Sequence, residues 1–261
     1  VRMLYSCGEC YNCRTGHTNM CTQAQRKPVR EGMIPGPGGL CDQIVVSTKD
    51  LFLIPDGISY EEASLTEPLA CCVHSIELGD IQLGDDVVVI GGGMMGINHV
   101  MLAKRKGARV IISEVDEERR KLALSLGADV AINPMECDVV EKVKELTGGR
   151  GADVVFNTTA IPSVVPEAIA MTGSFGKMVQ YSSMHPDAPV PVSPQMLHST
   201  QKILTGSISP TEIDFFRANR LISSGIVDMK SLIAATFPFE KAQDAFEKAI
   251  VPGTYRVIIK G

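Results

Sequence analysis

Three glycines that directly follow an apolar run constrain the fold of this chain more than any other feature of its sequence. The run from Val87 to Ile90 leads into GGGMMG, which gives Gly91, Gly93 and Gly96 the spacing G-x-G-x-x-G between a predicted strand and a predicted helix. The first glycine permits a tight turn, the second lets a pyrophosphate approach the backbone, and the third lets the helix pack closely on the strand. We therefore expect a dinucleotide to bind with its phosphates at the amino end of this helix.

An acidic residue stands where such a turn places the adenosine ribose. Glu114 follows Gly96 by 18 residues and ends the next predicted strand, so its carboxylate can accept hydrogen bonds from both ribose hydroxyls. A 2′-phosphate would meet like charge there, Val115 offers no cation, and Arg119 is the nearest cation in the sequence. This pattern favours NAD over NADP. The alternative interpretation is a glycine-rich strand–helix turn with a solvated glutamate.

Compact apolar strands alternate with amphipathic helices over residues 83–205. Strands are predicted at 87–90, 109–112, 130–132, 153–156, 178–181 and 203–205, and helices at about 94–106, 117–126, 137–147 and 162–171. Such alternation is typical of parallel strands joined by right-handed crossovers, so the predicted fold class is α/β with a doubly wound parallel Rossmann sheet.

Ligands of such a sheet lie outside the carboxyl ends of its strands. This rule places the residues after two further predicted strands near the cofactor. The predicted cofactor-binding residues are therefore Gly91, Gly93, Met94, Met95, Gly96, Glu114, Arg119, Thr158, Thr159 and Ser182.

Length and charge exclude several classes of protein. The 261 residues suffice for about two domains, and 25 basic against 30 acidic side chains give a net charge of −5 without the basic face that nucleic acid requires. The longest stretch without formal charge, residues 87–103, contains four glycines and is too poor in apolar residues for a membrane span. We expect neither nucleic acid nor a membrane as partner.

Four of the eight cysteines form a cluster near the start of the chain. Cys7, Cys10, Cys13 and Cys21 have the spacing C-x2-C-x2-C-x7-C, and four thiolates suit a closed, structural zinc site. The alternatives are a ferredoxin-type cluster, whose fourth cysteine would follow after three residues, a redox dithiol, which would use only one pair, and a metal-free lobe. A long chain without a secretory signal favours the reducing cytosol, so we expect a cytoplasmic protein.

The remaining parts of the chain give weaker signals. Residues 1–66 are rich in glycine and proline and predict loop and short strand, with the end of a strand at 1–5 and a β-branched strand at 44–46 after the GPGG run. A helix is predicted over 210–224 and a final strand over 255–259.

The cysteine cluster followed about 80 residues later by the dinucleotide turn resembles the zinc-dependent medium-chain dehydrogenases, most closely the polyol, sorbitol and threonine dehydrogenase branch. The resemblance extends over all 261 residues, through CGECYNCRTGHTNMC, TEPLACCVHSIE, GDDVVVIGGGMMG, ISEVDEERRKLALSLGAD, DVVFNTTA and LIAATFPFEKAQDAFEKA. It implies that residues 1–68 and 209–261 form a GroES-like, β-rich catalytic domain that is incomplete at its amino-terminal end. Residues 69–208 would then form the dinucleotide-binding Rossmann domain.

The resemblance also implies a second, catalytic zinc. In the family this zinc is bound by a Cys and a His-Glu pair upstream of the cysteine cluster, and by a third position that falls on Glu67 of TEPLACC. Glu67 is thus the implied catalytic and metal-binding residue, although on its own it could be a helix-start carboxylate. Because the other ligands would precede Val1, we expect residues 1–261 to bind cofactor without completing this site. The five histidines do not supply the missing ligands: His17 lies in the cluster, His74 and His99 in predicted helices, and His185 and His198 in predicted loops.

The implied enzyme passes a hydride between NAD and a secondary alcohol, such as a polyol, diol, sugar phosphate or amino alcohol, while zinc polarises the substrate oxygen. A small-molecule alcohol substrate and a homo-oligomer, dimer or tetramer, are expected.

Two positions depart from the family pattern, since Asn157 replaces a usual acid and Ala235 a common histidine. The alternatives are a zinc-free reductase of the same superfamily, which usually lacks the cysteine lobe, and a catalytically silent coenzyme-binding protein.

Overall fold

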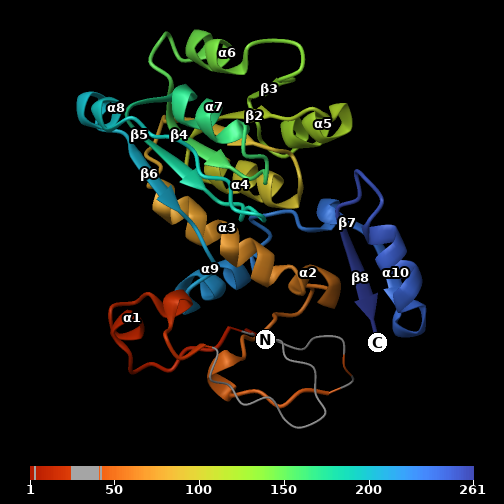
Figure 1. Ribbon diagram of the computed structural model, residues 1–261. Coiled ribbons are helices and arrows are strands. Elements are labelled where there is room, and N and C mark those ends of the chain that lie inside the picture. Colours follow the sequence, from red (N-terminus) through yellow and green to blue (C-terminus); the bar gives the residue numbers. More distant parts are fainter. Residues whose placement is uncertain (3, 25–40, 42) are drawn as a thin grey trace. The chain divides into compact units, whose positions relative to one another are not determined.

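The computed structural model describes residues 1–2, 4–24, 41 and 43–261, which form two compact units (Figure 1). The first unit consists of residues 1–71, 209–249 and 257–261, and the second of residues 72–208 and 250–256. The division falls inside helix α3 (Thr66–Gly79). In the described part of the chain no helix is both long and apolar enough to cross a membrane.

The second unit contains a six-stranded, fully parallel sheet with the order β3-β2-β1-β4-β5-β6. Its strands are β1 (Asp86–Ile90), β2 (Arg109–Ser113), β3 (Val130–Ile132), β4 (Ala152–Asn157), β5 (Thr172–Gln180) and β6 (Ile203–Gly206). Its helices besides α3 are α4 (Met94–Arg105), α5 (Glu117–Ser125), α6 (Val139–Leu146), α7 (Val164–Met171) and α8 (Pro194–Thr200). This is the doubly wound α/β fold that the sequence predicts.

Helices cover both faces of this sheet, which is why its strands are continuous apolar runs. Val88 and Ile90 of β1 belong to one buried cluster, together with Val143 of α6 and Met171 of α7. On the other face, Phe156 of β4 packs against Gly79 of α3 and the ring of His99 of α4. All five residues of β1 are buried, so the strand that carries the glycine turn lies at the centre of the core.

Two elements of this unit differ from the sequence-based expectation. Strand β5 begins at Thr172 rather than near Met178, because Gly151 and Gly173 let two backbones meet at a bulge: a Cβ at Gly173 would lie 2.8 Å from the carbonyl oxygen of Arg150. His198 lies in helix α8 and not in a loop. The side chain of Ser193 accepts a hydrogen bond from the Met196 amide and begins this short helix, whose apolar pattern is too brief to identify it from sequence.

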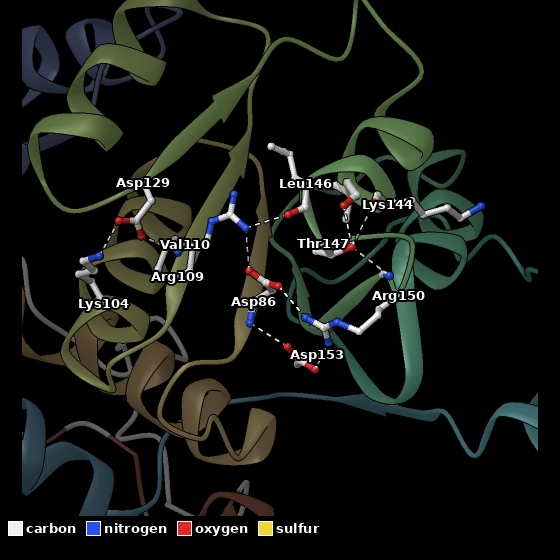
Figure 2. Close-up of polar contacts among 12 residues, drawn as sticks. Asp86, Lys104, Arg109, Val110, Asp129, Lys144, Leu146, Thr147, Arg150 and Asp153 are labelled. Atoms are coloured by element: carbon white, nitrogen blue, oxygen red, sulfur yellow. Dashed lines mark hydrogen bonds and ion pairs between the residues drawn. The ribbon is translucent and has the colours of Figure 1, made fainter.

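A polar network joins the amino ends of three strands, whereas the glycine turn follows the carboxyl end of β1. Figure 2 shows the Asp86 carboxylate between Arg109 and Arg150. The nitrogen–oxygen distances of these two ion pairs are 3.3 and 3.0 Å. Asp153 accepts a hydrogen bond from the Asp86 amide at 2.8 Å, and Arg109 also donates to the Leu146 carbonyl at 2.8 Å. The network ties β1, β2 and β4 to the end of α6.

The first unit contains short helices and a two-stranded sheet of β7 (Ile233–Pro238) and β8 (Arg256–Lys260), whose first residue belongs to the second unit. Its helices are α1 (Tyr11–Arg14), α2 (Tyr60–Ala63), α9 (Glu212–Ser223) and α10 (Ala242–Ala249), with 3-10 turns η1 (Thr18–Met20), η3 (Thr48–Asp50), η4 (Lys230–Leu232) and η5 (Phe239–Lys241). The predicted helix after Pro210 and the final strand are therefore present.

The strands expected at 1–5 and 44–46 are wrong for the described residues. Strands need a ladder of hydrogen bonds to a neighbour. Among the backbone bonds of the described residues, the segment at the start of the chain has only the 2.8 Å bond from the Arg2 amide to the Asp50 carbonyl. Arg2 is instead held by its buried guanidinium, which pairs with Asp50 and Glu212 at 2.7 Å each. The GPGG run lies outside the described residues.

Candidate functional sites

The glycine turn has the geometry that a dinucleotide site requires. Gly91 has φ +97°, a conformation that disfavours side chains, and a Cβ at Gly96 would lie 1.8 Å from the Gly91 carbonyl oxygen. Gly93 begins helix α4, and a Cβ there would meet no atom within 4 Å. The first and third glycines are thus required by the turn itself, whereas the second leaves space in front of the helix.

Glu114 lies buried beside this turn, directly after β2. One carboxylate oxygen accepts a hydrogen bond from the Gly92 amide, and the other accepts one from the Asp116 amide at 2.8 Å. Two backbone amides therefore hold the carboxylate at the carboxyl end of the strand. Arg119 flanks the same glycine, since a Cβ at Gly92 would lie 2.9 Å from Glu114 Cγ and 3.2 Å from Arg119 Cβ.

The loop after β4 reaches the glycine turn through Thr158. Its hydroxyl donates to the Ile90 carbonyl at 2.7 Å, and its amide donates to the same oxygen at 3.0 Å. Asn157, where the resemblance implies an acid, is fully buried: it accepts hydrogen bonds from the Thr159 amide and hydroxyl and donates to Gln180 at 2.9 Å. The amide group therefore serves both as donor and acceptor, which a carboxylate could not do.

The structure brings some of the predicted cofactor-binding residues together and leaves others apart. A surface pocket of about 310 Å³ in the second unit is lined by Gly93, Met94, Met95, Gly96, Thr158, Thr254, Tyr255 and Arg256. The other predicted residues do not line this pocket: Gly91, Glu114, Arg119, Thr159 and Ser182. Gln180 donates to the Ser182 carbonyl at 2.7 Å, and the Ser182 amide donates to the Asn157 carbonyl, so both bonds of Ser182 are made by its backbone.

Three residues of this pocket, 254–256, were missed from sequence. Arg256 donates from Nε to the sulfur of Met94 at 3.3 Å, and the Tyr255 hydroxyl donates to the Gly92 carbonyl at 3.0 Å. Burial raises the pKa of Tyr255 to about 12. In the sequence, these residues show only a basic side chain before an apolar strand. That pattern does not reveal that the segment packs against a turn more than 150 residues earlier.

His99 of α4 is fully buried in the core. Its Nδ1 lies 2.7 Å from the Met95 carbonyl and its Nε2 2.9 Å from the Ser75 hydroxyl, an arrangement that a neutral ring with a proton on Nδ1 satisfies. Burial lowers the pKa of His99 to about 4. This histidine is an uncharged packing residue that supports the first turn of α4.

The four cysteines of the cluster converge in the first unit. Their sulfur atoms all lie within 4.8 Å of one another, and those of Cys7 and Cys13 are 3.9 Å apart. Tetrahedral zinc with sulfur at about 2.3 Å requires sulfur–sulfur separations of about 3.8 Å, so the donor set fits a zinc ion.

Backbone amides surround these sulfurs. Cys7 Sγ accepts hydrogen bonds from the Glu9 and Cys10 amides at 3.4 and 3.3 Å, and Cys21 Sγ accepts from the Cys7 amide at 3.3 Å. Amides of Cys13 and Thr22 donate to Cys10 and lower the pKa of its thiol to about 6, whereas burial raises the pKa of Cys13 to about 12. Amide donors stabilise thiolates, the form that binds metal.

Glu67 lies exposed in the first turn of α3, and Cys71 one turn later donates its thiol proton to Glu67 at 3.4 Å. Among the described residues, three or more potential metal ligands converge only at the four cysteines. Glu67 does not belong to that group. One carboxylate and a neighbouring thiol do not make the three-ligand site of a catalytic zinc. The described part of the chain therefore does not by itself fit that second ion.

Sequence comparison finds relatives over nearly the whole chain. The family model "Zinc-binding dehydrogenase" matches residues 95–224. A 2-dehydro-3-deoxy-L-galactonate 5-dehydrogenase of Pseudoalteromonas atlantica is 31% identical, covering 94% of this chain and 70% of the relative. The sorbitol dehydrogenase of Bacillus subtilis is 30% identical, covering 94% and 68%. The D-arabitol-phosphate dehydrogenase of Enterococcus avium is 28% identical, covering 98% and 72%.

Structure comparison agrees. A zinc-binding dehydrogenase from Sinorhizobium meliloti, solved bound to NADP, is similar with a TM-score of 0.88 and 26% identity, over 98% of this chain and 74% of that one. L-idonate 5-dehydrogenase from Escherichia coli has a TM-score of 0.86 and 25% identity, over 98% and 73%. With the parallel Rossmann sheet, the glycine turn and the four-cysteine cluster in one chain, these similarities establish that the chain belongs to the zinc-binding medium-chain dehydrogenase family.

Proposed function

We propose that this protein is an NAD-linked, zinc-dependent oxidoreductase that transfers a hydride between nicotinamide and a secondary alcohol. One observation carries the proposal: a buried carboxylate, Glu114, is fixed by the Gly92 amide at the carboxyl end of β2, beside a turn of the sequence G-x-G-x-x-G. In parallel α/β folds this combination binds the adenosine ribose and the pyrophosphate of a dinucleotide.

The second unit offers candidate contacts for the phosphates of the cofactor. Gly93, Met94 and Met95 at the start of α4 line the pocket. Their amides would hold the pyrophosphate, with the helix dipole favouring its charge. Arg256, in the same pocket, adds a guanidinium that can pair with a phosphate oxygen. Thr158 braces the turn from the neighbouring strand. The nicotinamide, when bound, supplies the hydride acceptor, and the protein orients it against the alcohol.

The cofactor of preference is NAD in this proposal, because a 2′-phosphate would lie close to the Glu114 carboxylate. The similar Sinorhizobium meliloti structure was solved with NADP, so family membership alone does not decide between the two cofactors. What favours NAD in this chain is the anchoring of Glu114. Its two amide bonds prevent the carboxylate from turning away from an incoming phosphate without losing both of them.

The four-cysteine cluster is proposed to hold a structural zinc through Cys7, Cys10, Cys13 and Cys21. Its sulfurs already lie at separations that fit the ion, and no position is left over for a substrate. In this role zinc would stabilise a lobe whose helices are only three to four residues long.

Glu67 is proposed as one ligand of the catalytic zinc, with the remaining ligands upstream of Val1 as the resemblance implies. The substrate class is proposed from relatives whose names denote dehydrogenases of sorbitol, D-arabitol phosphate and L-threonine. We further propose that the protein is a homo-oligomer in the cytoplasm. Residues 1–68 and 209–261 are assigned to the catalytic domain, and residues 69–208 to the coenzyme-binding domain. Residues 254–256 add pocket contacts to the coenzyme-binding domain.

The activity test is NADH formation with a panel of polyols, diols, sugar phosphates and amino alcohols, using the protein extended upstream of Val1 to include the implied Cys and His-Glu ligands. The proposal expects turnover that is lost with Glu67→Ala while NAD binding is retained. Turnover that is unaffected by this substitution would remove Glu67 from the active site. An absence of NADH formation across the panel would contradict the proposed reaction.

A further inference from the structure

The loop that carries the four cysteines is bonded at two points to one residue of a distant helix. Glu212 is the first residue of α9, and its carboxylate accepts a hydrogen bond from the Ser6 hydroxyl at 2.5 Å. Its amide donates to the Thr18 hydroxyl at 3.1 Å. All three residues belong to the first unit. Glu212 therefore joins the residue before Cys7 to the 3-10 turn η1, which ends at Cys21.

A buried arginine holds the Glu212 carboxylate in this position. The Arg2 guanidinium pairs with Glu212 and Asp50 at 2.7 Å each, and 2% of its side chain is exposed. It also donates to the Ser6 hydroxyl at 3.3 Å. Because a charge buried in this way is costly to leave unpaired, Arg2 keeps the Glu212 carboxylate beside Ser6.

The two bonded points fix the first and the last ligand of the cluster. Cys7 follows Ser6 directly, and the Cys21 amide donates to the Thr18 carbonyl at 3.3 Å. The Cys7 amide in turn donates to Cys21 Sγ at 3.3 Å. Bringing the ends of a flexible loop together costs conformational entropy, which metal binding must offset when nothing else closes the loop. A loop already closed on α9 reduces that cost.

Glu212 differs from an acid that merely stabilises the positive end of a helix. Glu117 has that simpler role at the same first position of α5: its side chain is 70% exposed and pairs with Lys121 of its own helix at 2.9 Å. The Glu212 carboxylate instead bonds two residues that lie more than 200 positions earlier in the chain. Among the described residues, the converging metal ligands are the four cysteines, so Glu212 is not a ligand itself.

We infer that Glu212 is a positioning residue for the cysteine cluster: it ties Ser6 and Thr18 to the start of α9 and thereby preorganises Cys7 and Cys21 for zinc. It acts through these two neighbours of the ligands and does not touch the ion. The inference rests on the proposed function, because that proposal supplies the zinc.

The experiment measures the zinc dissociation constant of the full chain in zinc–chelator buffers, with bound zinc determined by elemental analysis. A Glu67→Ala background removes the proposed ligand of the catalytic zinc, so that bound metal reports the cysteine cluster. We expect Glu212→Ala to weaken zinc binding about tenfold, as loss of an outer-shell contact does. Glu212→Gln keeps an acceptor for Ser6 and should weaken it by less than about threefold, whereas Thr18→Val, which removes the acceptor of the Glu212 amide, should weaken it about threefold.

Glu117→Ala is the matched control, because it removes an acid from the same helix position without a contact to the cluster. Its zinc dissociation constant should stay within about twofold of the wild-type value. A wild-type constant in Glu212→Ala, or an equal weakening in Glu117→Ala, overturns the inference and leaves the zinc site intact.

Circular dichroism checks that each variant is folded at the temperature of the titration. If Glu212→Ala does not fold, the isosteric Thr18→Val decides the question, and an unchanged zinc constant in that variant overturns the inference. A folded wild type that binds no zinc at the cluster removes the proposed zinc site and the inference together.

Discussion

Replacing the second and third glycines of the turn by alanine should separate folding from cofactor binding. In Gly96→Ala, the new Cβ would lie 1.8 Å from the Gly91 carbonyl oxygen and 2.8 Å from its carbon, atoms of a backbone that cannot rotate away. Real Cβ contacts stay above 3.0 Å, so the first turn of α4 and the end of β1 must separate by at least 1.2 Å.

The cost of Gly96→Ala can be worked from this geometry. Overpacking a core costs about 1–3 kcal/mol and more when backbone must move, whereas alanine in place of glycine in a helix recovers about 1 kcal/mol. We expect a net loss of about 2 kcal/mol, which lowers the unfolding midpoint by roughly 6 °C for a unit of this size. Cofactor binding should be lost with the shape of the turn.

Gly93→Ala is the matched control. A Cβ at Gly93 meets nothing within 4 Å, and its φ of −67° suits any residue, so the folding free energy should change by less than about 1 kcal/mol. The methyl group would nevertheless stand where the pyrophosphate approaches, and NAD binding should weaken at least about tenfold. Thermal unfolding followed by circular dichroism and NAD⁺ titration provide the two measurements. Wild-type stability in Gly96→Ala, or wild-type NAD affinity in Gly93→Ala, would refute this assignment of roles to the two glycines.

Three further predictions concern other parts of the molecule. Elemental analysis should find about one zinc per chain and almost none after Cys10→Ser; iron, or a folded wild type that needs no metal, would contradict the zinc assignment. Asp86→Ala leaves Arg109 and Arg150 (Figure 2) without their shared carboxylate and should lower the free energy of unfolding by about 1–2 kcal/mol. The control Glu118→Ala, at an exposed ion pair, should change it by under about 0.5 kcal/mol. Equal effects of the two substitutions in chemical denaturation would show that the network adds no more stability than an exposed pair. Burial lowers the pKa of His99 to about 4 in the folded protein. As pH falls below 6.5 the histidine of the unfolded chain is protonated first, which favours unfolding. About 3 kcal/mol of stability should therefore be lost progressively between pH 6.5 and 4. His99→Gln should flatten unfolding free energies over that range, and an unchanged slope would assign the effect to other groups.

The Rossmann half of the molecule is predictable from sequence because its strands are buried on both faces. A run such as Val87–Ile90 is apolar throughout, its end is marked by Gly91, and the following helix starts within a few residues. Local signals of this kind agree with the tertiary structure. Where β5 begins early, two glycines permit a close backbone approach that depends on a partner strand, and sequence patterns carry no information on that partner.

The cofactor site is predictable only in part for the same reason. Glu114 and the glycines lie close together in sequence and follow a known spacing. Tyr255 and Arg256 reach the site from the far end of the chain, and their contacts with Gly92 and Met94 arise from tertiary packing. Ser182 shows the converse, because a position after a parallel strand is not sufficient for a place in the pocket.

The central claim, an NAD site built around Glu114, is tested most directly by titrating the wild type and Glu114→Ala with NAD⁺ and NADP⁺. The account predicts stoichiometric NAD⁺ binding at least about tenfold tighter than NADP⁺ binding, because the charged carboxylate loses its ribose hydrogen bonds and meets a dianion when NADP⁺ binds. In Glu114→Ala the two affinities should converge. Tighter binding of NADP⁺ by the wild type, or a preference that survives the loss of Glu114, would contradict it.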